Sequence, residues 1–84
     1  MLTFVEHPHD NVRVFVDFDY KKVKPTAFFW AGKRYDIASV NLVYKRRNGD
    51  HHDMCFAVSD AANTYVLRYN PENMEWILDE VQGT

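Results

Sequence analysis

Four histidines lie in two short clusters whose side chains could bind a metal ion. His7 and His9 are two residues apart, so an extended chain would point both imidazoles to one side. His51 and His52 are flanked by aspartates, and imidazole with carboxylate is a ligand set that suits Zn²⁺ or Ni²⁺. The spacing leaves open whether the two clusters meet in the fold. Because no cysteine pair accompanies them, we interpret them as two exposed polar loops and predict no metal site.

A reactive nucleophile is the second kind of chemistry to look for. Cys55 alternates with Met54 and Phe56, which is typical of a small buried hydrophobic residue and not of an activated thiol. Asp17 and Asp19 share one strand face and could act as an acid and base pair, but solvated carboxylates explain them more simply. The chain has neither a phosphate-binding glycine loop nor a zinc-protease motif. We therefore predict no catalytic residues, no cofactor and no enzymatic activity.

Binding is the remaining option, and the charged residues bear on it. Most lysines and arginines lie within residues 20–47, which contain a single aspartate, whereas both flanking segments are acidic. We interpret the contrast as opposite charges that pair across neighbouring strands, and the alternative is a basic binding face. The candidate binding residues are Phe15, Lys33, Arg34, Lys45, Arg46 and Arg47.

Two classes of partner fit these residues. Phe15, an aromatic on a polar strand face, could anchor a protein partner or a second copy, and the edge of an open sheet could accept an added strand. In the alternative, the basic segment 21–47 contacts the phosphates of a nucleic acid, and Phe15, Phe29 and Tyr44 stack on its bases. The acidic flanks and a pI of about 6.0 oppose a polyanion. We predict an interaction or accessory module that binds a protein partner or forms a homodimer, with nucleic-acid binding as the alternative.

Alternating apolar residues predict the strands that must position these side chains. Residues 12–18 place valines on one face, and residues 26–31 are apolar on both faces, as in a covered strand. Residues 34–46 form the longest expected strand, and their apolar phase slips once near residue 38, which indicates a β-bulge or bend. Residues 54–58 and 65–69 alternate again.

The C-terminal segment 71–82 fits two structures. Apolar residues from Met74 to Val81 have helical spacing. Residues 70–73 also suit a hairpin turn, after which Trp76 begins another strand. We predict the strand, because tryptophan and isoleucine favour strands over helices.

These segments together predict an all-β protein. We expect one small domain over residues 1–84, an antiparallel meander of five to seven short strands curled into a barrel or roll. A chain of 84 residues buries a modest share of its surface, so six phenylalanines, five tyrosines and two tryptophans supply an efficient core. The expected core residues are Val14, Val16, Phe28, Trp30, Tyr35, Ile37, Val40, Leu42, Phe56, Val58, Tyr65, Leu67, Trp76 and Leu78.

An aromatic pattern runs through about two thirds of the chain. It reads Pro25-x-x-Phe28-x-Trp30-x-Gly32-x-x-Tyr35-x-Ile37, then Phe56-x-Val58, Tyr65-x-Leu67-x-Tyr69 and Trp76-x-Leu78. In this pattern the chain resembles a family of small uncharacterised bacterial β-rich domains. The resemblance implies an all-β fold. Because some relatives are similar to domains appended to DNA-repair polymerases, it also implies an accessory binding role, and it supplies no catalytic residues.

Cysteine usage and hydropathy bear on the compartment. Cys55 is the only cysteine, which argues against a disulfide scaffold and for a reducing environment. No apolar run approaches the ~18 residues of a membrane helix, and residues 1–10 lack the order of a signal peptide. We expect a cytoplasmic protein without a membrane partner.

Overall fold

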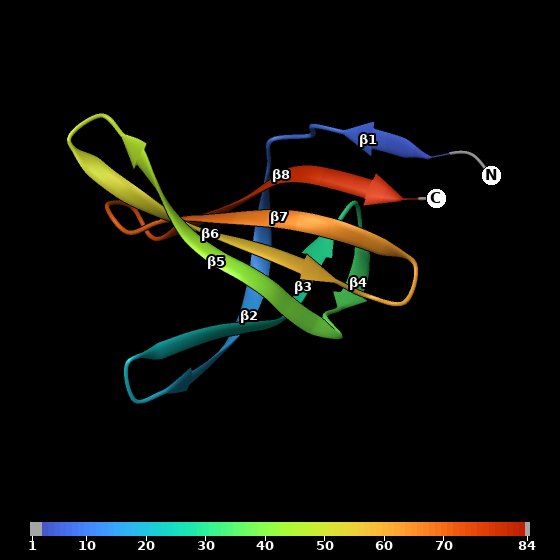
Figure 1. Ribbon diagram of the computed structural model, residues 1–84, viewed down its shortest axis with the longest axis horizontal. Coiled ribbons are helices and arrows are strands. Elements are labelled where there is room, and N and C mark those ends of the chain that lie inside the picture. The colour runs from blue at the N-terminus through green and yellow to red at the C-terminus, as the bar shows by residue number, and fades with distance from the viewer. Residues whose placement is uncertain (1–2, 84) are drawn as a thin grey trace.

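Eight β-strands make up the computed structural model, which describes residues 3–83 (Figure 1). None of these residues forms a helix, so this part of the chain contains no helical membrane span. The strands are β1 (Phe4–Glu6), β2 (Asp10–Asp19), β3 (Lys22–Trp30), β4 (Lys33–Asp36), β5 (Ser39–Asn48), β6 (His51–Ser59), β7 (Asn63–Asn70) and β8 (Glu75–Gly83).

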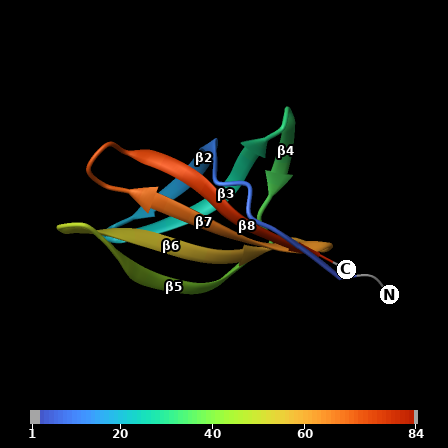
Figure 2. The same cartoon turned by 90° about the horizontal axis from the view of Figure 1, so that it is seen from above.

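The strands form one antiparallel sheet in the order β4-β3-β2-β8-β7-β6-β5, and β1 pairs with β8 beside this row. Most neighbours in the sheet are also neighbours in the chain. The exceptions are the pairings of β1 and β2 with β8, and β2 meets β8 through Asp10–Val12 and Trp76–Leu78. Two perpendicular views show the sheet curling on itself (Figures 1 and 2). The predicted antiparallel meander is confirmed, and its curl makes a half-barrel.

One end of the half-barrel is closed and the other is open. At the closed end residues 37–38 link β4 to β5, and the Ile37 amide donates to the Thr26 carbonyl at 2.9 Å. Toward the other end β5 and β3 diverge, and the β2–β3 hairpin projects from the body (Figure 1). We call the space between β5 and the Lys22–Thr26 half of β3 the wedge. Since β4 pairs with β3 only through Ala27–Trp30, no described strand pairs with β3 on the side that faces the wedge.

Aromatic rings form the core on the concave face of the sheet. Phe28 is fully buried, stacks on Tyr35 at 5.1 Å between ring centroids and meets Tyr65 edge-on at 5.0 Å. Phe56 packs against Trp76 at 5.4 Å. Of the expected core, Phe28, Phe56, Val58, Tyr65, Leu67 and Leu78 are fully buried, and Val14, Val16, Trp30, Tyr35, Ile37, Val40 and Trp76 are partly buried.

The expected core position of Leu42 is wrong. A register shift between Val40 and Leu42 gives β5 one extra residue against β6. Because side chains alternate along a strand, the extra residue turns Leu42 to the outer face, where it is 57% exposed. The bulge or bend expected near residue 38 is the corner at residues 37–38, and the bulge in β5 is a separate irregularity slightly further along the chain.

The strand count also exceeds the expected range. Residues 34–46 are not one strand: β4 ends at Asp36, and β5 begins at Ser39 after the corner. β1 and β4 are three and four residues long, too short for alternation to mark them clearly. The C-terminal segment is strand β8 and not a helix, as predicted.

Candidate functional site

The free edge of β5 is the main candidate for a binding site. β5 is ten residues long and pairs with β6 on one side, and no described strand pairs with its other side. Leu42, Val43 and Tyr44 follow one another on this edge and are 57%, 46% and 39% exposed. An edge strand presents unpaired backbone amides and carbonyls, which charged residues commonly protect from unwanted pairing. Here charges begin only at Lys45, so the apolar stretch before it is open to strand addition.

The pairing with β6 tells which face each β5 side chain occupies. Val43 pairs with Phe56 of the core, so Val43 and the alternate residues Lys45 and Arg47 lie on the concave face. Leu42, Tyr44 and Arg46 therefore lie on the outer face. Each face of β5 therefore carries both apolar and basic side chains.

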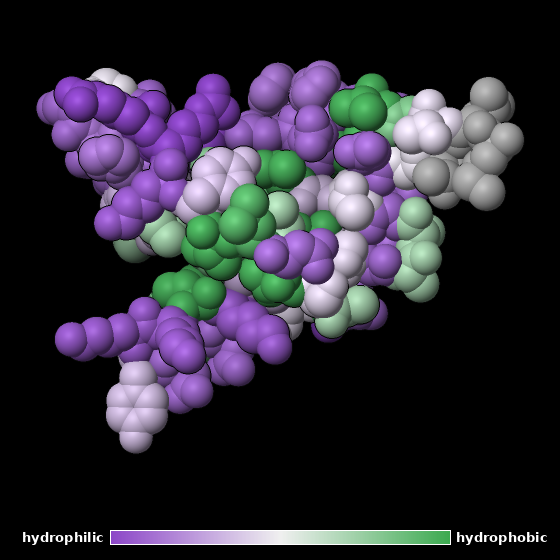
Figure 3. All heavy atoms as spheres, viewed as in Figure 1, coloured by the Kyte–Doolittle hydropathy of each residue, from purple (hydrophilic) through white to green (hydrophobic). Residues whose placement is uncertain are grey.

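An apolar groove lies between the projecting β2–β3 hairpin and the β7–β8 turn, where the wedge opens. It has a volume of about 390 Å³. Figure 3 shows the corresponding notch between the projecting hairpin and the body, with apolar surface gathered at its inner end. Phe18 pairs with Val23 on the groove side of the hairpin, yet it is 73% exposed because nothing in the described chain packs over it. The lining residues are Val14, Phe15, Val16, Phe18, Val23, Tyr69, Met74 and Trp76.

Two of the predicted binding residues, Phe15 and Arg34, meet on the outer face of β2–β4. The Arg34 guanidinium lies 5.2 Å from the centre of the Phe15 ring, and Phe15 packs edge-on against Phe29 at 5.5 Å. Arg13 lies over Phe29 in the same way, at 5.5 Å. Arg34 also donates to Asp36 at 2.8 Å. The two rings are therefore partly covered by arginines of their own chain, which explains an aromatic on this polar face.

The other predicted binding residues lie elsewhere. Lys33 precedes Arg34 in β4 and points to the opposite face, with its ammonium 5.2 Å from the centre of the Tyr35 ring. Lys45, Arg46 and Arg47 are on β5, at the other edge of the sheet order. The structure thus divides the predicted set between two sheet edges and both faces.

A buried ion network fastens the outer face of β6, β7 and β8. Arg68 donates to Asp79 at 2.7 and 3.2 Å and to Asp53 at 3.1 Å. The side chains of Arg68, Asp79 and Asp53 are only 17%, 9% and 1% exposed. Asn48 and His51 complete the shell around Asp53, each at 3.0 Å. Buried charges are tolerated only when paired and hydrogen-bonded in this way, so the network holds the uncovered face of the sheet together.

The pKa shifts in this network follow from its hydrogen bonds. Burial alone would raise the pKa of Asp53, but its hydrogen bonds, led by that from Asn48, outweigh burial and lower the pKa. Burial acts in the same direction on Asp79, and hydrogen bonds from Arg68 and His9 outweigh it and lower that pKa too. Both carboxylates are therefore ionised at neutral pH, which suits a structural role and not proton transfer.

Each histidine cluster reaches a different aspartate of the network. His9 Nδ1 lies 3.0 Å from Asp79, and His51 Nε2 lies 3.0 Å from Asp53. Among residues 3–83, no three histidine, cysteine, aspartate or glutamate side chains are placed to hold a metal ion. The clusters thus contribute hydrogen bonds to the edge of the network.

Cys55 is buried on the outer face, between Tyr44 and Arg68 in the register. Burial is the main reason that the pKa of its thiol is raised. A buried thiol with a raised pKa is a poor nucleophile.

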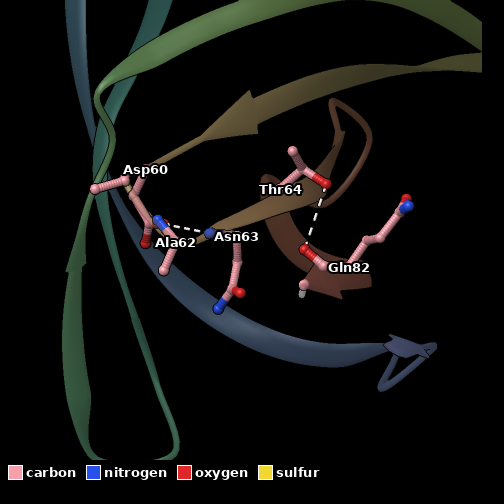
Figure 4. Close-up of a pocket in the computed structure, with 7 residues that line it drawn as sticks. Asp60, Ala62, Asn63, Thr64 and Gln82 are labelled. Atoms are coloured by element: carbon pink, nitrogen blue, oxygen red, sulfur yellow. Dashed lines mark hydrogen bonds between the residues drawn. The ribbon is translucent and has the colours of Figure 1, made fainter. Parts of the chain in front are cut away.

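A shallow polar pocket lies where the β6–β7 turn meets the end of β8 (Figure 4). The Asp60 carboxylate accepts from the amides of Ala62 and Asn63 at 2.8 and 2.7 Å, and from the Tyr65 hydroxyl at 2.7 Å. The Thr64 hydroxyl contacts the Gln82 carbonyl at 3.5 Å. Since these polar groups already hydrogen-bond to one another, the structure of the turn accounts for the polar residues that line the pocket.

Comparison with protein-family models, with curated proteins and with solved structures gave no match. The family resemblance drawn from the aromatic pattern therefore stays a prediction.

Sequence reasoning missed the wedge and the ion network. The run Leu42-Val43-Tyr44 is apolar on both faces, which normally marks a covered central strand and not an edge. Asp53 stands in an alternating buried strand, in phase with Cys55, and this was the available signal for a buried charge. Its partners on β7 and β8 depend on register, which the sequence does not reveal.

Proposed function

We propose that the protein is a non-enzymatic interaction module that binds a protein partner by adding an extended segment to β5. The observation that carries this proposal is the free edge of β5, with its three consecutive exposed apolar residues. Backbone hydrogen bonds along such an edge supply affinity, and alternate side chains supply specificity. A second copy of the chain, pairing β5 with β5, is the homodimeric form of the same proposal. The single unpaired cysteine supports action in a reducing compartment such as the cytoplasm.

Nucleic-acid binding through residues 21–47 is the competing function. Two observations count against it. Arg34 and Arg46 lie 2.8 and 3.9 Å from carboxylates of Asp36 and Asp79, which neutralise part of the basic charge. Lys33 and Arg34 also face opposite sides of β4. Titration with labelled single-stranded oligonucleotides tests the alternative, because salt-sensitive binding would support it over the protein partner.

The test of the proposed function uses a matched pair of variants. Peptides selected from a random displayed library on the full chain are measured against V43K and V5K. Val43 and Val5 are exposed to similar extents, 46% and 49%, but Val5 lies on β1, away from the wedge. We expect V43K to weaken the selected peptides by roughly tenfold or more, because a lysine blunts the edge, and V5K to leave them unchanged. A selection without binders, or binders that V43K does not affect, would refute strand addition to β5.

Self-association is measured on the same proteins by sedimentation velocity. A concentration-dependent dimer that V43K dissociates and V5K preserves supports the homodimeric form. A dimer insensitive to V43K shows that copies meet elsewhere and contradicts it.

A further inference from the structure

The wedge is bordered by two strand edges that lack partner strands in the described chain, although Thr26 at the end of one of them accepts a hydrogen bond from Ile37. One is β5, and the other is the Lys22–Thr26 half of β3. The order of strands runs from β3 through β2, β8, β7 and β6 to β5, so a strand added to β5 on its free side comes next to β3. Such a strand would turn the half-barrel into a closed ring, and closure removes exposed edges altogether.

The groove on the concave side of the wedge is apolar, whereas Lys45 and Arg47 of β5 bring basic groups to the same face. Phe18 and Val23 pair on the groove side of the projecting hairpin. Tyr69 and Trp76 form the opposite wall of the groove. They pair with each other across β7 and β8, and the same line of paired residues continues through Met54 of β6 to Lys45 of β5. Inward side chains of an added strand would therefore meet rings and aliphatic groups where they enter the groove, which favours apolar residues there at every second position. Along β5 they would lie beside Lys45 and Arg47.

The outer side of the wedge is basic. Lys22 and Lys24 lie opposite Asp19 and Asp17 on the outer face of the hairpin. Among the described residues neither lysine has a carboxylate within the 4.0 Å of an ion pair, so both ammonium groups are available to a neighbour. Arg46 faces outward from β5, is 64% exposed and makes only a long contact of 3.9 Å with Asp79. Outward side chains of an added strand would therefore lie between Lys22 and Lys24 on one side and Arg46 on the other, with Asp17 and Asp19 one strand further from the wedge.

We propose that the wedge binds an extended segment of a partner protein in which apolar residues alternate with acidic ones. The segment pairs with the free edge of β5, places its apolar side chains in the groove and turns its carboxylates toward Lys22, Lys24 and Arg46. The inference rests on the proposed function and gives the chemical class of its partner. The β5 edge of a second copy is a poorer occupant, because Lys45, Arg46 and Arg47 would bring more positive charge to a basic border.

The test uses a labelled synthetic peptide of about ten residues, a usual strand length, in which glutamate alternates with valine and phenylalanine. One comparison peptide carries lysine in place of glutamate, and another has the same composition with the glutamates gathered at one end. Fluorescence anisotropy gives the Kd for each peptide on the full chain. We expect the alternating acidic peptide to bind roughly tenfold or more tightly than either comparison peptide.

Two pairs of variants locate the contacts. K22Q/K24Q and K33Q/R34Q remove the same charge, but Lys33 and Arg34 lie on β4, outside the wedge. F18S removes a ring from the groove, and Y20S removes a fully exposed ring from the hairpin tip. We expect K22Q/K24Q to weaken the acidic peptide by roughly five- to tenfold and F18S by roughly tenfold, with little effect of the matched variants. Circular dichroism of each variant verifies that the sheet is intact.

Each other outcome overturns the inference in an identifiable way. The inference is wrong if the acidic and the lysine peptides bind with similar Kd values. It is also wrong if the two variants of a pair weaken the acidic peptide equally. If library peptides require Val43 but the alternating acidic peptide does not bind, the inference fails and the proposed function stands. If a dimer of the protein excludes the peptide from the wedge, a second copy is the occupant and the inference fails. If no peptide of any kind depends on Val43, both fail.

Discussion

Replacement of Arg68 by methionine should be among the most destabilising single changes to this fold. The methionine keeps much of the side-chain volume and removes the charge. Asp79 and Asp53 then lose three hydrogen bonds from the guanidinium, at 2.7, 3.2 and 3.1 Å, while both remain buried. Removing one partner from a buried ion pair costs about 3–5 kcal/mol. A chain of this length has a total stability of about 4–12 kcal/mol, so R68M should lose a large fraction of it.

The pH dependence of this loss identifies its cause. Loss of the guanidinium raises the pKa of both carboxyls from their lowered native values, so R68M takes up protons at a higher pH than the wild type. As the pH falls, the free energy of unfolding of the wild type therefore decreases more than that of R68M. The deficit of R68M relative to the wild type should be smaller at about pH 4.5 than at about pH 7. Urea unfolding followed by tryptophan fluorescence at both pH values measures it.

A matched control distinguishes the stability cost of removing a buried arginine from that of removing an exposed one. Arg46 contacts the same Asp79 at 3.9 Å but is 64% exposed, so R46M should cost less than about 1 kcal/mol. A cost for R68M of similar size to that for R46M, or a deficit that does not change with pH, would refute the account of the buried network.

Three further predictions concern the network and the core. The pKa values of Asp53 and Asp79 are lowered in the native state, so the stability they contribute is present at neutral pH and lost as the pH falls through the native values, below about pH 4. Urea unfolding should show a flat stability above about pH 5 and a steep loss below pH 4, and an early loss near pH 6 would contradict it. Burial and a hydrogen bond to Asp60 raise the pKa of Tyr65 to about 12, and burial also raises the pKa of Tyr44, so Y65F should reduce the late part of an ultraviolet titration by the share of one tyrosine. W76A should cost about 3 kcal/mol in urea unfolding, because Trp76 packs on two rings of the core, and wild-type-like unfolding would show that the core is misassigned.

Strong local patterns made the fold class predictable. Alternation in residues 12–18, 54–58 and 65–69 marked β2, β6 and β7, since each has one face on the core. The C-terminal segment was harder, because its apolar spacing suits a helix as well. Residues 71–74 do form the turn before β8, so local turn chemistry and the strand preference of Trp76 decided that element.

Features that depend on register were not predictable. Leu42 was expected in the core, and one extra residue in β5 turned it outward. The same shift turned Val43 inward and left an apolar stretch on a sheet edge. The Arg68 network depends on a second irregularity, between Val66 and Leu67, which gives β8 the extra residue Asp79. Bulges of this kind arise from packing between strands that are distant in sequence.

The binding residues predicted from the sequence were chosen by type and not by position. Phe15 and Arg34 do meet, but they cover each other on the outer face. The strand that borders the wedge, β5, carries Lys45, Arg46 and Arg47. They belong to the proposed interface because β5 is an edge strand, which the distribution of charge along the sequence did not predict. The groove residues Phe18 and Val23 were seen only as part of alternating strands.

Amide hydrogen exchange along β5 tests the central claim most directly. In an edge strand every second amide points away from its only partner strand, so in the free protein alternate amides from Leu42 to Arg47 should exchange rapidly. Saturation with the alternating acidic peptide should slow those same amides by roughly tenfold or more and leave the amides of β1 unchanged. Uniform protection of β5 in the free protein, or bound peptide that leaves these amides as fast as before, would contradict a free edge that takes up a partner strand.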